Sequence, residues 1–171
     1  MSTMEALFTK HDYARLPEGF PAQLIEGQLV REAAPLYGHQ QVVGRLYRSL
    51  CEVCDPTLVL LSPVDCPIDE LNVFQPDVAI YGEPPPPDEG GTLVPRVVFE
   101  VLSPSTAARD RDPKLRRYLA AGVEEVWLLD RKSGSIEVHT PRGARVAHGP
   151  DSLRSGCVPS LVLVPDELFC S

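Results

Sequence analysis

Two acidic residues and one lysine occupy unusual positions in the sequence. Asp77 follows Pro76 at the start of one apolar run, and Glu100 lies in the middle of another, residues 96–103. An ionised carboxylate among such neighbours is costly to bury unless it is paired or binds a metal. Lys114 follows shortly after the second run, where a helix is expected to begin. These three residues are the candidates for a catalytic site.

Two carboxylates on neighbouring strands can converge on one hard divalent cation. Mg²⁺ is usually held by one or two carboxylates, and water and substrate phosphate complete its octahedron. Such a cation polarises a phosphate ester and lowers the pKa of water, while a nearby lysine stabilises developing charge or orients the attacking water. We therefore expect Asp77 and Glu100 to bind Mg²⁺ or Mn²⁺, with Lys114 as the third catalytic residue.

Two helices are expected to support this site. Apolar residues recur every three or four positions over residues 38–54, which predicts an amphipathic helix. Asp112 and Pro113 predict the start of a second helix, which is expected to run to Ala121 and to end at Gly122. A further short helix is expected over residues 5–17.

The strands are expected from apolar or alternating runs of strand length. One expected strand precedes the second helix and another follows it, and this order predicts a crossover in a buried, partly parallel sheet. The predicted fold class is therefore α/β with a mixed central sheet. Residues 82–91, rich in Pro and Gly, are expected to form a surface loop. The expected strands are residues 22–31 as a hairpin around Glu26 and Gly27, and 58–62, 75–81, 96–103, 123–130, 135–140 and 161–164.

Composition limits the class of protein. A chain of 171 residues suits one domain, residues 1–171. Hydrophobic residues make up 43% and charged residues 23%, as in soluble globular proteins. The sequence lacks an apolar run of roughly 18 residues, which a membrane helix needs, and an N-terminal basic segment followed by an apolar one. We therefore expect a cytoplasmic protein without a membrane partner.

The charge distribution is uneven. A net charge of −8 argues against a large nucleic-acid surface. Nevertheless, residues 109–117 contain five of the sixteen basic residues. The arginines of this segment are candidates for phosphate contacts: Arg109, Arg111, Arg116 and Arg117.

The five cysteines do not predict a metal site. Cys51 and Cys54 have a zinc-like spacing, but no second pair of Cys or His residues completes four ligands. An odd, scattered set is also a poor disulfide framework. Buried, inert thiols are the preferred interpretation.

The candidate residues lie in a longer pattern. It comprises residues 75–77, 97–105, 110–114 and 118–130, and it extends back to residues 23–27 and 38–40. Taken together, these segments resemble the Uma-type putative restriction-endonuclease family of the PD-(D/E)XK nuclease superfamily. The combination is specific, whereas its single motifs are not.

This resemblance implies a restriction-endonuclease-like core, a central mixed sheet flanked by helices. It implies that Asp77 and Glu100 bind the metal. The usual superfamily lysine lies two residues after the glutamate, where this chain has Leu102, and Lys114 takes its place on the following helix. Members often have Glu where this chain has Gln23. This departure removes one acid, and Glu26 is not expected to replace it.

Each candidate also has a purely structural interpretation. Asp77 can be an ordinary strand-end residue, since Asp is common there. Glu100 can pair with Arg45 or Arg48 of the long helix. Lys114 can be a solvated helix lysine. Their joint occurrence in the family pattern favours a site.

Three other residues of the pattern are less specific. His39 can approach the metal or the phosphate, or it can cap or pack against the long helix. Tyr118 and Trp127 match the family pattern, but aromatic residues that face a sheet are more often core.

The predicted function is a metal-dependent phosphodiesterase, with DNA endonuclease activity as the leading hypothesis and nucleic acid as the partner. A homodimer would suit cleavage of both strands. The alternative is a non-catalytic binding or assembly domain that retains the nuclease fold. An RNA or nucleotide phosphodiesterase would use the same residues.

Overall fold

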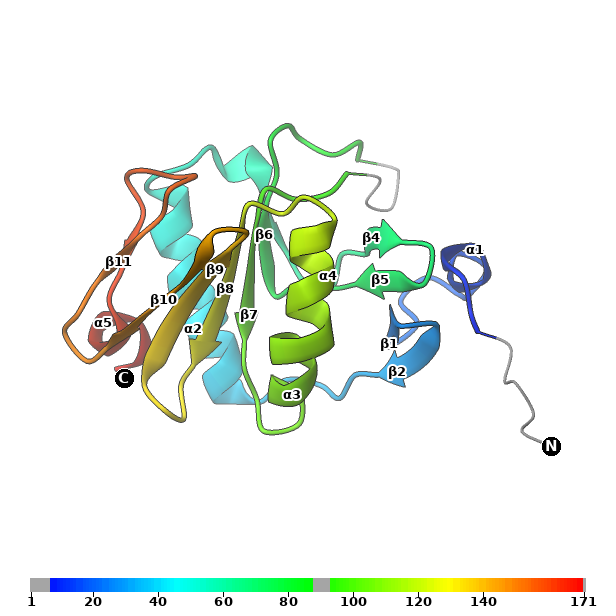
Figure 1. Cartoon of the computed structure of the whole chain (residues 1–171), viewed down its shortest axis with the longest axis horizontal. Helices are drawn as coiled ribbons and strands as arrows, with labels where there is room; N and C mark the ends of the chain where they lie inside the picture. Colours follow the sequence, from blue (N-terminus) through cyan, green and yellow to red (C-terminus); the bar gives the residue numbers. More distant parts are fainter. Residues whose placement is uncertain (1–6, 88–92, 171) are drawn as a thin grey trace.

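The computed structural model describes residues 7–87 and 93–170 and has a mixed α/β fold (Figure 1). Its central sheet contains β3 (Val59–Leu61), β6 (Val78–Ile80), β7 (Val97–Val101), β8 (Glu125–Asp130), β9 (Ser135–Thr140) and β10 (Gly143–His148). The strand order is β10-β9-β8-β7-β6-β3. β7 and β8 pair in parallel, whereas the other neighbours in this sheet are antiparallel. The predicted mixed sheet is confirmed.

The parallel pair requires a crossover, and three short helical elements provide it: α3 (Ala107–Arg109), η2 (Asp110–Lys114) and α4 (Leu115–Ala120). The prediction of one regular helix from Asp112 was wrong in its first turn. Asp112 has an extended backbone (φ −169°, ψ 126°), and Pro113 has no N–H to donate. A wide turn therefore precedes α4. The predicted end is confirmed, because Gly122 has φ +98° directly after the helix.

Each face of the central sheet packs against its own helix. Helix α2 (Tyr37–Cys51) covers one face and α4 the other (Figure 1). Side chains of β7 alternate between the faces: Val97, Phe99 and Val101 join the core under α2, and Val98 joins the core under α4. By the same alternation, Glu100 faces α4.

A smaller sheet lies beside the α4 side of the molecule (Figure 1). Its order is β2-β1-β5-β4, with bounds β1 (Ala22–Ile25), β2 (Gln28–Arg31), β4 (Cys66–Asp69) and β5 (Asn72–Phe74). The predicted hairpin is confirmed, because Glu26 and Gly27 have φ +50° and +76°, as a two-residue hairpin turn requires. The β4–β5 hairpin was not predicted, since its strands are short and β4 contains Pro67.

The ends of the chain differ most from the sequence-based expectation. The helix expected over residues 5–17 is described from residue 7 onward, and there only α1 (Lys10–Tyr13) is helical; it begins at Lys10 because Thr9 and Asp12 form a capping box. Residues 1–6 and 88–92 lie outside the described part, so the predicted 82–91 loop is described as far as residue 87 and has no helix or strand there. The remaining elements are η1 (Pro56–Leu58), β11 (Leu153–Arg154), β12 (Val162–Leu163) and α5 (Pro165–Phe169).

Among the described residues, every helix is too short or too polar to cross a lipid bilayer.

Two glycines give a matched test of the left-handed backbone assigned to Gly122 at the end of α4. Gly122 has φ +98°, and an added Cβ would meet nothing within 4 Å, so Gly122→Ala should cost about 1–2 kcal/mol of unfolding free energy through backbone strain alone. Gly44 lies on the exposed side of α2 with equally open space. Gly44→Ala should therefore add about 0.5–1 kcal/mol through helix propensity. Urea denaturation should show opposite signs, and equal signs would contradict the assignment.

Candidate active site

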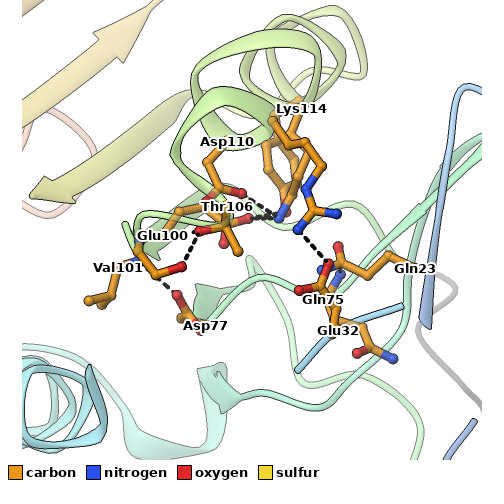
Figure 2. A network of polar contacts seen from close by, with 12 residues as sticks. Gln23, Glu32, Gln75, Asp77, Glu100, Val101, Thr106, Asp110 and Lys114 are labelled. Carbon is orange, nitrogen blue, oxygen red and sulfur yellow. Dashed lines mark hydrogen bonds and ion pairs between the residues drawn. The ribbon is translucent and has the colours of Figure 1, made fainter. Parts of the chain in front are cut away.

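The pairing of β6 with β7 brings the two candidate acids together. Val78 is opposite Phe99, so one further step of this antiparallel register places Asp77 opposite Glu100. Oδ2 of Asp77 accepts a hydrogen bond from the backbone N–H of Val101 at 2.7 Å. This bond anchors Asp77 to the end of β7, as Figure 2 shows.

Glu100 is buried, with 3% of its surface exposed, and its partners come from the crossover. Lys114 Nζ lies 2.6 Å from Glu100 Oε1, and the hydroxyl of Tyr118 donates to the same oxygen at 2.7 Å. The alternative that Glu100 pairs with Arg45 or Arg48 was wrong. Helix α2 packs on the other face of the sheet, and Arg45 donates a hydrogen bond to the carbonyl of Leu168.

Lys114 is not a solvated helix lysine, since only 2% of its surface is exposed. Its second partner is Asp110, whose Oδ1 lies 3.1 Å from Nζ (Figure 2). Asp110 is buried as well, although the sequence alone did not single it out. The available signal was its spacing of four residues from Lys114, which places two side chains on one helical face.

The buried charges shift one another's pKa values. Burial raises the pKa of Glu100 to about 8; Lys114 opposes this shift, whereas Asp110 and Asp77 add to it. Burial alone would lower the pKa of Lys114, but the charges of Glu100 and Asp110 raise it above its ordinary value. Burial also keeps the pKa of Tyr118 well above its usual range. Lys114 is therefore a cation and Tyr118 a neutral donor at physiological pH.

Tyr118 and Trp127 were expected in the core, and both are fully buried. Trp127 stacks on Phe99. Tyr118 additionally orients Glu100, a role that its aromatic character alone did not indicate.

His39, for which the sequence allowed either a role in the site or a structural one, lies beside Asp77. Its Nε2 is 3.2 Å from Asp77 Oδ2, and 16% of its side chain is exposed. Burial would lower the pKa of His39, but the hydrogen bond and charge of Asp77 raise it above its usual value. Its Nδ1 is buried without a hydrogen-bond partner among the described residues. The imidazole thus holds the same carboxylate oxygen as the backbone of Val101.

Gln23 serves the architecture around the site. Its side-chain oxygen accepts a hydrogen bond from the backbone N–H of Gln75 at 2.8 Å, which ties β1 to the segment leading to Asp77. Glu26 does not supply the missing acid, because it lies on the surface and pairs with Arg117 at 3.3 Å.

The four arginines of residues 109–117 each face a carboxylate on the surface. Phosphate binding by any of them would therefore require an exchange of partners. The pairs are Arg109 with Glu32, Arg111 with Asp130 and Glu137, Arg116 with Asp112 and Glu26, and Arg117 with Glu26 and Asp69.

The carboxylate pair suits a cation of the Mg²⁺ type. Asp77 uses Oδ2, and Glu100 uses Oε1, for their contacts with the protein. Within residues 7–87 and 93–170, Oδ1 of Asp77 and Oε2 of Glu100 accept no hydrogen bond. In the same residues, no group of three or more His, Cys, Asp or Glu side chains gathers as a metal cage. Mg²⁺ needs only one or two carboxylates when water and phosphate complete its shell.

Comparison with known proteins agrees with this architecture. The Uma2 family, described as "Putative restriction endonuclease", matches residues 11–164. The chain also resembles the crystal structure of a "putative nuclease belonging to DUF820" from Anabaena variabilis, with 20% sequence identity and a TM-score of 0.82. That similarity covers 95% of this chain and 97% of the other and shows a shared fold. No curated protein matches the chain. The chain belongs to the Uma2 family of putative restriction endonucleases.

Proposed function

We propose that this protein is a metal-dependent phosphodiesterase that acts as a DNA endonuclease. The observation that carries the proposal is the meeting of Asp77 and Glu100 across β6 and β7, with the buried ammonium of Lys114 at 2.6 Å from Glu100. The description of the family supports the same chemistry. The substrate bond is a phosphodiester, and the superfamily resemblance implies a 5′-phosphate and a 3′-hydroxyl as products.

Each side chain has a separate role in this proposal. Asp77 and Glu100 hold a divalent cation, Mg²⁺ or Mn²⁺, which when bound polarises the scissile phosphate and lowers the pKa of water. Lys114 supplies positive charge next to the phosphate, where charge develops in the transition state. Tyr118 orients Glu100, and His39 orients Asp77, through the contacts described above.

A second function, a non-catalytic binding or assembly domain, is favoured by one observation. The surface arginines of residues 109–117 pair with carboxylates of the same chain. A domain of this kind would keep the fold without cleaving DNA. The experiment below separates the two functions.

Replacement of Asp77 tests the proposal. Asp77→Asn keeps the shape of the side chain but removes its charge, so we expect weaker Mg²⁺ binding and at least about a hundredfold slower nicking of supercoiled plasmid. Asp151→Asn removes an exposed carboxylate between β10 and β11 and should change neither. Calorimetry with Mg²⁺ and Mn²⁺ measures binding, and EDTA should stop the wild-type reaction.

Three results would contradict the nuclease proposal. Full cleavage by Asp77→Asn would place the site elsewhere or reveal a contaminant. Cleavage that persists in EDTA would exclude the metal dependence. Metal binding without cleavage of any nucleic acid would favour the assembly domain.

A further inference from the structure

One arginine that the sequence pattern did not single out lies at the same end of the sheet as the site. Arg131 is exposed in the turn between β8 and β9. Within the described residues its side chain forms no hydrogen bond or ion pair, in contrast to the arginines of residues 109–117, which face carboxylates. Its charge is therefore available to an external anion.

The sheet register places this turn next to the catalytic carboxylates. β7 and β8 are parallel, with Val101 opposite Leu129, so the residues after Leu129 continue past the end of β7. Val101 is the residue whose N–H binds Asp77. The end of β7, the β8–β9 turn and the start of α2 lie along the lower edge of the molecule in Figure 1.

A glycine makes room for the guanidinium of Arg131. A Cβ added to Gly38, in the first turn of α2, would overlap the side-chain nitrogens of Arg131. Gly38 precedes His39, which lies 3.2 Å from Asp77. The guanidinium thus lies against the residue next to a side chain of the site.

An exposed aromatic residue next to Gly38 suits contact with a nucleic-acid strand. Tyr37 precedes Gly38 and is 79% exposed, and aromatic rings of this kind stack on bases. A guanidinium carries a fork of donors that matches two phosphate oxygens. The protein has a net charge of −8, so an arginine beside the site that has no acidic partner among the described residues offers phosphate a positive charge that is not already neutralised.

We propose that Arg131 binds a backbone phosphate of the substrate strand next to the scissile phosphate, and that Gly38 leaves room for its guanidinium at this position. The inference rests on the proposed nuclease function and adds to it the residue that positions the strand. Arg131 binds the ground state and the transition state alike, so it acts on affinity and not on the chemical step.

The test is DNA binding and cleavage by matched variants. Binding of a fluorescein-labelled 20-base-pair duplex is followed by anisotropy in EDTA from 50 to 200 mM salt. Arg131→Ala should weaken binding roughly three- to tenfold and reduce the slope of log affinity against log salt by about one. Arg142 is also exposed but lies in the β9–β10 turn, at the opposite end of the sheet. Arg142→Ala should bind as the wild type does.

Gly38→Ala tests the position of the charge separately from its presence. The added methyl should displace the guanidinium and weaken binding although every charge remains, and the double variant should bind as Arg131→Ala alone. In plasmid cleavage, both single variants should raise KM and leave kcat unchanged.

The outcomes separate this inference from the proposed function. Wild-type affinity in Arg131→Ala, or an equal loss in Arg142→Ala, would overturn the role of Arg131 while wild-type cleavage still supports the nuclease. A fall in kcat at constant KM would also overturn it. A wild type that neither binds nor cleaves the duplex would overturn both.

Discussion

Glu100→Gln should lower the rate of plasmid cleavage at least about a hundredfold, while the protein stays folded. The amide has the shape of the carboxylate and still accepts the hydrogen bond from Tyr118, but it supplies no negative charge to a divalent cation. Calorimetry should show that Mg²⁺ binding is lost together with cleavage. Retained Mg²⁺ binding or retained cleavage would contradict the role proposed for Glu100.

The difference in stability between the wild type and the same variant should depend on pH in a defined direction. Burial raises the pKa of Glu100 from 4.5 to about 8. A carboxyl group whose pKa is higher in the folded state stabilises that state fully below pH 4.5, and this contribution is lost as the pH rises toward 8. Gln does not titrate. Urea denaturation at pH 5 and pH 8 should therefore show that the wild type loses stability relative to Glu100→Gln, and the opposite trend would contradict burial as the dominant cause.

Lys114→Met should reduce both stability and activity. Methionine fills a similar volume, but it leaves Glu100 and Asp110 buried without the cation that lies 2.6 and 3.1 Å from them. Removal of one partner of a buried ionic network costs about 3–5 kcal/mol of unfolding free energy. Cleavage should fall as well, because the role proposed for Lys114 requires its positive charge. Chemical denaturation and plasmid nicking at pH 7.5 measure the two effects.

A matched lysine provides the control for this variant. Lys132 is exposed in the β8–β9 turn, so Lys132→Met should leave the free energy of unfolding unchanged. The loss in Lys114→Met should also grow above pH 8, where Glu100 ionises and needs a counter-charge. If Lys114→Met is as stable as the wild type at pH 7.5, the buried network does not hold the crossover against the sheet.

Local signals in the sequence were sufficient where one residue type had few physical explanations. A carboxylate in a five-residue apolar strand needs a partner, so Glu100 could be singled out without a structure. Gly27 and Gly122 marked a turn and a helix end, because both have positive φ values that glycine adopts without strain. The mixed sheet followed from the order of apolar runs around one helix.

Local signals failed where an element is short or its charges are ambiguous. The β4–β5 hairpin has strands of four and three residues, too few for a periodic pattern to stand out. Asp110 lies in a run of alternating charges that resembles a solvated surface, yet it is buried against Lys114.

The sequence by itself determined the family and the mixed α/β fold and singled out the three residues proposed for catalysis, because residue types and the order of apolar runs can be read along the chain. Tertiary structure alone decided which charges are paired. It joined Lys114 to Asp110, placed His39 beside Asp77 and engaged the arginines of residues 109–117 with carboxylates, whereas Arg131 has no such partner in the part of the chain that the structure describes. These pairings depend on strand register and on the faces that helices cover, and both arise only when distant segments pack together.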